Sequence, residues 1–259
     1  LSDPLRSGGM NGLDILPKGL TFINYQVLFS NKNVLPSIFN SLFITLVGTV
    51  LNILLTILAA YALTRPQLVG KRVLMVFFII MMLFDPGIVP EYMVVKALKL
   101  TGSQWSIILC QAMNVYYLIV MMRYFEAVPP SLYEAARIDG ANHFSILFKI
   151  VCPLAKAGVA TLTMFYGVAR WNEYYRSGIY ISSISKAPLQ VILRKFVVDG
   201  DVTALIGTQN LFDYNALAKL DYTALQYATI IVAIIPILLV YPLVLKFYTK
   251  NVMAGGVKE

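Results

Sequence analysis

The chain has 259 residues and a formal net charge of +8, and 58% of its residues are hydrophobic while only 13% are charged. An ordinary soluble domain has about 25% charged residues, and a particle of this size cannot bury so much apolar surface. The composition therefore excludes a soluble enzyme, a disordered chain and a coiled coil, and it requires lipid as part of the solvent. Because membrane proteins gather lysine and arginine on one side, the positive charge does not indicate nucleic-acid binding.

Five apolar runs predict an all-α, polytopic membrane protein, because a helix needs about 20 residues to cross the hydrocarbon layer. The runs cover residues 38–63, 73–84, 105–122, 157–169 and 224–245. Asp85-Pro86-Gly87 interrupts the second run, which is expected to continue, kinked, to Val95. Pro236 and Pro242 predict kinks in the fifth helix and do not exclude it from the membrane.

Lysine and arginine are densest in three loops on one side of an alternating topology, and this side is predicted to be cytoplasmic. Those residues are Arg65, Lys71, Arg72, Arg123, Arg137, Lys149, Lys156, Lys246, Lys250 and Lys258. Residues 1–37 then form an extracytoplasmic segment, 124–156 a cytoplasmic loop and 174–222 an extracytoplasmic loop. Because five visible spans begin outside, a sixth, N-terminal membrane helix is expected to be missing from this chain.

The sequence gives no sign of a catalytic or metal site. The single histidine, His143, cannot form a metal site by itself, and Cys110 and Cys152 form no CxxC pair. An ion-driven carrier needs ionisable residues in mid-span, and the runs 38–63, 105–122 and 224–245 contain none. The sequence contains no G-x-x-x-x-G-K-[ST] loop, so it is not expected to hold ATP phosphates in that way.

The predicted cytoplasmic loop carries a spaced motif. It reads Glu134-Ala135-Ala136, three residues, Gly140, nine residues, Ile150, two residues and Pro153. Ser131 stands three residues before Glu134, which is the spacing of a capping box, so a short helix is predicted over 132–139 with Gly140 as its stop. A second helix is predicted over about 142–151, before Pro153.

This spacing resembles the EAA loop of the membrane subunits of bacterial ABC importers, with Cys152 where that family usually has leucine. The resemblance implies that the loop carries a coupling helix, which seats in a groove of an ATPase subunit. The residues that it assigns to ATPase coupling are Glu134, Ala135, Ala136, Asp139, Gly140, Ile150 and Pro153. Two small alanines permit close approach to a partner, and the glycine permits a tight turn.

Further segments resemble the carbohydrate-uptake branch of these permeases, among them Asn40-Ser41, Tyr61-Ala62-Leu63-Thr64-Arg65 and Trp171-Asn172-Glu173. Pro90-Glu91-Tyr92 and the stretch 170–174 look most like permeases for complex or uronate-type oligosaccharides, a group that includes the alginate importer. The resemblance implies a multi-pass protein of the bacterial inner membrane, with residues 38–259 as the transmembrane domain. It also implies four kinds of partner: membrane lipid, a second homologous permease, two ATP-binding subunits that hold ATP and Mg, and an extracytoplasmic solute-binding protein. No cofactor is expected in this chain.

Sugar-binding sites combine aromatic faces with side-chain hydrogen bonds. The candidates for the substrate path are Asn114, Tyr116, Tyr117, Trp171, Asn172 and Glu173. An interfacial aromatic belt is the alternative for the rings, and Asn114 is expected to face the bundle interior. An ion-coupled secondary transporter and an ABC permease for a non-sugar solute are the alternative functions.

Overall fold

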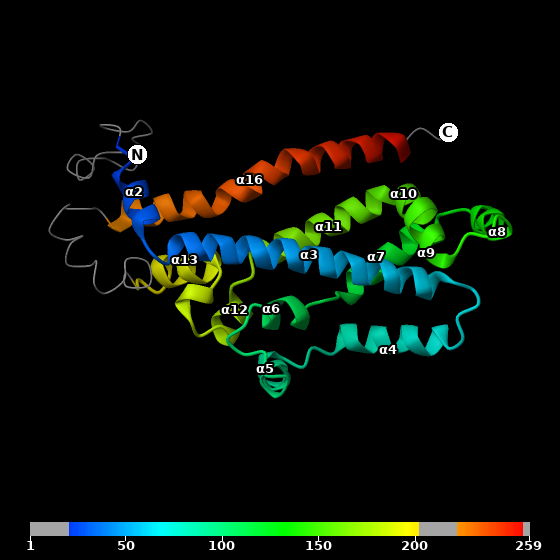
Figure 1. Cartoon of the computed structure of the whole chain (residues 1–259), viewed down its shortest axis with the longest axis horizontal. Coiled ribbons are helices and arrows are strands. Elements are labelled where there is room, and N and C mark those ends of the chain that lie inside the picture. Colours follow the sequence, from blue (N-terminus) through cyan, green and yellow to red (C-terminus); the bar gives the residue numbers. More distant parts are fainter. Residues whose placement is uncertain (1–20, 202–221, 256–259) are drawn as a thin grey trace. The chain divides into compact units, whose positions relative to one another are not determined.

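The computed structural model describes residues 21–201 and 222–255, and every regular element in these ranges is a helix (Figure 1). The predicted all-α class is confirmed for this part of the chain. Residues 1–20 of the predicted N-terminal segment and 202–221 of the predicted loop 174–222 lie outside the described residues. The described residues form two compact units, the first made of 21–44, 101–104, 171–201 and 222–240, and the second of 45–100, 105–170 and 241–255.

The helices have the following bounds: α2 Ile23–Ser30, α3 Val34–Thr64, α4 Lys71–Leu83, α5 Ile88–Ala97, α6 Trp105–Cys110, α7 Val115–Glu126, α8 Pro130–Ile138, α9 His143–Ile146, the π-helix η1 Leu147–Val151, α10 Cys152–Leu154, α11 Lys156–Trp171, α12 Tyr175–Tyr180, the 3-10 helix η2 Ile184–Lys186, α13 Leu189–Val197 and α16 Tyr222–Gly255.

Helix α3 confirms the first predicted span. Its 31 residues carry no charge, and within the described ranges it is the one unbroken helix long and apolar enough to cross a membrane. At 1.5 Å per residue it is longer than the hydrocarbon core of about 30 Å. Two bent helix pairs bring the number of spans to three if each pair counts as one span, so five spans remain a prediction.

The second run breaks where the sequence predicts, but it turns more sharply than a kink. Helices α4 and α5 are bent by 116° at residues 84–87. The Gly87 N–H donates to Asp85 Oδ1 at 2.9 Å, and Gly87 has a φ of +78°, a backbone conformation that glycine adopts without strain. A side-chain-closed turn, rather than a bent continuous helix, therefore separates the two pieces.

The third run, predicted as one helix over 105–122, is two helices. Helix α6 ends at Cys110, and α7 begins at Val115 and continues to Glu126. Asn114 caps α7, because its side-chain oxygen accepts the Tyr117 N–H at 3.2 Å. Asparagine competes in this way with the helical backbone pattern, which explains the break in an otherwise apolar run.

The fourth and fifth runs form helices with shifted ends. Helix α11 covers the predicted 157–169 and is bent by 87° from the preceding helical segment 143–154. Helix α16 contains the predicted 224–245 and runs through Pro236 and Pro242.

The core of the second unit lies around α7. Leu118, Met121, Met122 and Phe125 on one face of α7 are buried together with residues of α3, α8 and η1. Helix α11 approaches α7 closely at Gly158, where an added Cβ would overlap the ring of Tyr124. The close crossing therefore depends on a residue without a side chain.

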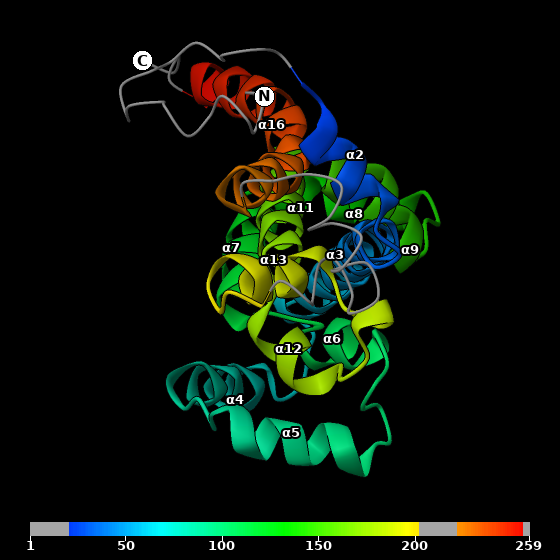
Figure 2. The ribbon, with the colours of Figure 1, turned by 90° about the vertical axis from the view of Figure 1, so that its left-hand side faces the viewer.

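In the first unit the start of α3 holds the segment that leads into α13, and α12 and α13 lie side by side (Figures 1 and 2). The Ser41 hydroxyl accepts the Leu189 N–H at 2.8 Å, and Asn40 Nδ2 donates to the carbonyls of Ser185 and Ala187. Each bond gives a polar side chain of an apolar helix a backbone partner, which buried polar groups require.

Candidate functional site

The predicted coupling loop begins with helix α8, which starts one residue before the predicted Ser131 cap. Pro129 is the N-cap residue, and no side chain caps the helix, so the predicted capping box is wrong. Proline suits the first helical position because its missing N–H has no partner there in any case. Pro130 therefore starts the helix before Ser131 can act as its cap.

Gly140 ends α8 as predicted. Its φ is +77°, the Ala141 N–H donates to the Ala136 carbonyl at 2.9 Å, and the Gly140 N–H donates to the Arg137 carbonyl at 3.1 Å. These two bonds satisfy carbonyls that a helix end leaves without partners. A Cβ at Gly140 would meet no atom within 4 Å, so the requirement for glycine is in the backbone conformation and not in the space.

The second helical segment of the loop is longer than predicted. Asn142 caps α9, accepting the Ser145 N–H at 2.8 Å, and α9 continues through η1 and α10 to Leu154. The prediction that it ends before Pro153 is wrong, since Pro153 lies in the first turn of α10, where its lack of an N–H is tolerated. A π-helical stretch precedes it, and such stretches are often found at functional sites.

The seven residues assigned to coupling differ in their exposure. Ala136 is buried and Ile150 packs against the same core, whereas Glu134, Ala135, Asp139, Gly140 and Pro153 are exposed. Two large apolar side chains that the sequence reasoning did not name are also exposed, Ile138 at 86% and Phe144 at 67%. The loop thus presents a mixed polar and apolar surface that is suited to a protein partner.

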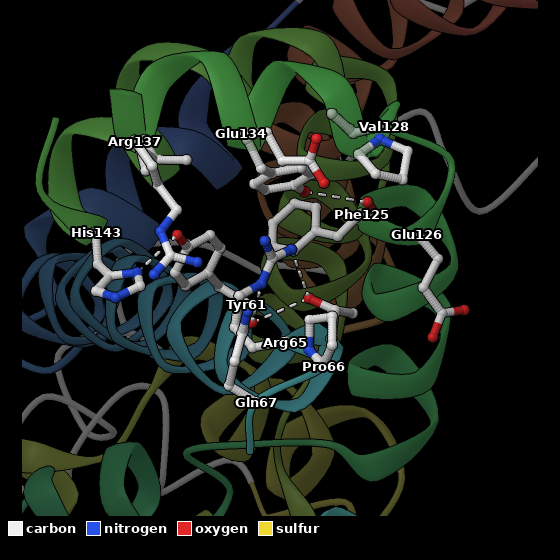
Figure 3. A pocket seen from close by; sticks show the side chains of 14 residues that line it. Tyr61, Arg65, Pro66, Gln67, Phe125, Glu126, Val128, Glu134, Arg137 and His143 are labelled. Atoms are coloured by element: carbon white, nitrogen blue, oxygen red, sulfur yellow. Dashed lines mark hydrogen bonds between the residues drawn. The ribbon is translucent and has the colours of Figure 1, made fainter. Parts of the chain in front are cut away.

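A cavity of about 270 Å³ lies between α8, α9 and the ends of α3 and α7 (Figure 3). Arg65 lies in it with its guanidinium carbon 4.5 Å from the ring centre of Tyr61 and 3.9 Å from that of Tyr133. The Tyr61 hydroxyl is 3.2 Å from His143 Nδ1. Residues that line the cavity therefore connect the end of α3 to the predicted coupling loop, through the Arg65 cation and the rings of Tyr61 and Tyr133.

A second polar group of residues surrounds the break between α6 and α7. The Asn114 N–H donates to the Tyr166 hydroxyl at 3.0 Å, and that hydroxyl is 2.8 Å from Thr56 Oγ1. The Tyr117 ring meets the Tyr166 ring edge-on at 4.9 Å. The structure thus brings Asn114 and Tyr117 together with two residues that the sequence reasoning missed, while Tyr116 is 59% exposed.

Arg170, also missed, is buried at the same break. Its guanidinium donates to the carbonyls of Ile107, Ile108 and Gln111 and, at 3.0 Å, to Asn52 Oδ1. The three carbonyls belong to the end of α6 and the residues just after it, where helical partners are lacking. Gly48 makes room for this side chain, since a Cβ there would lie 3.1 Å from Arg170 Nε.

The other predicted path residues, Trp171, Asn172 and Glu173, belong to the first unit. Trp171 is buried and its indole N–H donates to the Ala233 carbonyl at 3.1 Å. Glu173 Oε1 accepts the Arg176 N–H at the start of α12, and Asn172 is exposed. Trp171 is thus held by a contact with α16 and Glu173 by a contact with the start of α12, and the role of all three residues in a substrate path stays a prediction.

The family model described as "Binding-protein-dependent transport system inner membrane component" matches residues 52–253. The chain belongs to this family. The match covers α3 from Asn52 onward, both polar groups of the second unit and the whole predicted coupling loop. The predicted location in the bacterial inner membrane is thereby confirmed, as is the prediction of an ABC importer permease.

Relatives and a solved structure agree with the family. The chain is 36% identical over 245 residues to the polygalacturonan/rhamnogalacturonan transport system permease protein YtcP of Bacillus subtilis, covering 94% of this chain and 84% of that one. It is 26% identical over 260 residues to the arabinooligosaccharides transport system permease protein AraQ of the same organism, covering 99% and 85%. A bacterial ABC transporter involved in the import of the acidic polysaccharide alginate has a chain with a TM-score of 0.88 and 31% identity, covering 95% of this chain and 86% of that one.

Replacing Arg170 by methionine should lower the free energy of unfolding of this chain by about 3 kcal/mol or more, because buried carbonyls at the helix break lose their donor. Arg123 is the matched control, since its ion pair with Glu126 is largely exposed and its loss should cost about 1 kcal/mol or less. Denaturant unfolding of both variants in detergent, followed by tryptophan fluorescence, measures the difference. Equal midpoints for R170M and R123M would contradict the prediction.

Proposed function

We propose that this chain is one of two permease subunits of an importer that carries acidic oligosaccharides across the inner membrane by alternating access. The energy comes from ATP hydrolysis on two partner subunits, which hold ATP and Mg, and an extracytoplasmic binding protein delivers the substrate. The second permease is a homologue of this chain. The sequence supports this division of labour, since it contains no phosphate-binding loop of its own.

The proposed substrate class rests on the acidic polysaccharides for which two of the similar proteins are named. The solved importer takes up an acidic polysaccharide, and YtcP is named for polygalacturonan, whose repeating sugar bears a carboxylate. Both similarities extend over more than nine tenths of this chain. We therefore assign uronate-type oligosaccharides to this chain ahead of neutral sugars.

The coupling role is supported by the loop geometry. Helix α8 and the α9–α10 segment are joined by a turn at Gly140, which is closed by backbone hydrogen bonds from the Gly140 and Ala141 N–H groups. Ala136 and Ile150 fix the loop to the core, while Ile138 and Phe144 are exposed beside the motif. In this proposal the exposed side chains enter the groove of the ATPase, and the buried ones transmit its movement.

The substrate path is assigned to the break between α6 and α7. A break within an apolar run brings backbone and amide groups to a depth where a saccharide needs hydrogen-bond partners. Asn114, Tyr116 and Tyr117 lie at the first turn of α7, directly after this break. Trp171, Asn172 and Glu173, at and just after the C-terminal end of α11, are proposed as further residues of the path.

A ligand panel in proteoliposomes tests the function as a whole. The chain is purified from native membranes with the proteins that accompany it, and ATP hydrolysis is measured with the binding protein and either oligogalacturonate or a neutral arabino-oligosaccharide. We expect an ATPase and a second permease to co-purify, and oligogalacturonate to stimulate hydrolysis more strongly. Stimulation by the neutral sugar alone would overturn the substrate class, and a chain that transports without any ATPase would overturn the importer.

Gly140→Val should uncouple the importer while the membrane fold stays intact. A β-branched residue with a φ of +77° costs about 1–3 kcal/mol, which the α8 turn relieves by changing shape. Gly70→Val is the control, because Gly70 has the same φ of +77° in the left-handed region and an equally open Cβ position outside the loop. ATP-driven uptake should be lost only in G140V, and wild-type uptake in that variant would refute the coupling role.

Tyr116→Ala should raise the KM for oligogalacturonate uptake about three- to tenfold, because the variant loses the binding free energy of one aromatic contact. Tyr227→Ala is the control, since Tyr227 on α16 is exposed to a similar degree, at 62%. Uptake of labelled ligand at graded concentrations measures both. A KM that changes equally in the two variants would remove Tyr116 from the path.

A further inference from the structure

Arg65 lies at the end of the membrane-length helix and touches the predicted coupling helix. It follows α3 directly, and its Nε donates to the Tyr61 carbonyl at 3.3 Å while its Nη2 donates to Thr64 Oγ1 at 3.3 Å. The Tyr61 carbonyl belongs to the last turn of α3, where a helix lacks internal donors and favours a positive charge. These bonds orient the guanidinium as a fixed extension of α3.

The same guanidinium is placed between two tyrosine rings from different elements. Its carbon lies 4.5 Å from the ring centre of Tyr61 on α3 and 3.9 Å from that of Tyr133 on α8. Both distances are within the range of a cation–π contact, and arginine, being planar, suits such stacking better than lysine does. Figure 3 shows Arg65 and Tyr61 in the cavity beneath α8.

Tyr133 is itself fixed to a third element. Its hydroxyl donates to the Phe125 carbonyl at 3.3 Å, near the end of α7, and its ring is half-buried. The Tyr133 side chain therefore contacts α3 through Arg65 and α7 through its hydroxyl. A displacement of α8 cannot occur without moving the Arg65 side chain or breaking its contact with the Tyr133 ring.

We propose that Arg65 is a positioning residue that ties the coupling helix α8 to the end of α3, so that movement of α8 on the ATPase is passed to α3. This inference rests on the proposed function of the loop and goes beyond it, because it names the link between the loop and a membrane helix. The link consists of a cation held by α3 and stacked on a ring of α8. Ala136, three residues after Tyr133, is buried in the core against which Tyr133 also packs, so the cation–π contact of Arg65 adds a specific attachment to this apolar packing.

The test uses the whole importer in proteoliposomes and compares the oligogalacturonate transported for each ATP hydrolysed. R65M removes the cation, R65K keeps the charge without the planar fork, and R72M removes a neighbouring exposed charge at the start of α4 as a control. Y133L removes the ring of α8, and Y133F keeps the ring but loses the hydroxyl bond to Phe125. Assembly is followed by co-purification of the ATPase.

We expect the ratio of transport to hydrolysis to fall about tenfold in R65M, which removes two partly desolvated cation–π contacts, and about three- to fivefold in Y133L, which removes one of them. R65K should recover part of this loss, Y133F should stay within about twofold of the wild type, and R72M should match the wild type. A variant that was merely destabilised would give less complex with an unchanged ratio. The ratio therefore separates the positioning role from a structural one.

Different results overturn different claims. A wild-type complex that couples normally, with R65M and Y133L giving the wild-type ratio, would overturn the role of Arg65 and leave the importer standing. If R65M does not assemble, Y133L and Y133F decide, because both keep Arg65, and equal ratios in these two variants would overturn the role. Absence of any ATPase from the wild-type preparation would instead overturn the proposed function.

Discussion

Carbonyl oxygens at a helix break inside an apolar span must find donors within the protein, because lipid offers none. Arg170 meets this constraint at the end of α6, where one buried guanidinium reaches three carbonyls and the Asn52 amide. The arginine enters from α11, and Asn52 and Gly48 of α3 receive it. One side chain therefore joins three elements around the break, where Asn114 and Tyr166 are also hydrogen-bonded to each other.

The α6–α7 break and the proposed coupling loop both lie in the second unit, but different kinds of contact stabilise them. At the break, polar side chains occupy a region that would otherwise be apolar, and the proposed path for a hydrophilic substrate rests on these side chains. At the loop, a short helix is held by one buried alanine, one stacked cation and one tyrosine hydroxyl. Each of these contacts can be removed by a substitution of its own, so the proposed coupling role can be examined one contact at a time.

The sequence predicts the elements with a local cause and misses those that depend on distant partners. The uncharged run of α3, the interruption at Asp85-Pro86-Gly87 and the glycine stop of α8 are each visible in consecutive residues, and each is confirmed. The division of residues 105–122 carries no proline or glycine as a sign. Only the polar residues Gln111 and Asn114 mark it, and Arg170 and Tyr166 from a later helix bond to the backbone of these two residues.

The candidate site also combines features that consecutive residues predict with features that depend on distant residues. The spacing of Glu134, Gly140 and Pro153 indicates the family, yet the capping box and the end of the second helix are wrong, because proline placement overrides them. In the sequence, Arg65 was visible as a basic residue on one side of the membrane and as the last residue of a segment that resembles carbohydrate-uptake permeases. Its stacking on Tyr133 joins residues 68 positions apart in sequence, a contact that composition and periodicity do not report.

The crossing of α7 and α11 has a consequence for reading related sequences. Because a Cβ at position 158 would overlap the Tyr124 ring, the sizes of the side chains at these two positions are not independent. A relative with a larger residue at the position of Gly158 needs a smaller one at the position of Tyr124 or a wider spacing of the two helices. Compensating exchange at this pair across an alignment is therefore a record of how closely the two helices pack in each member.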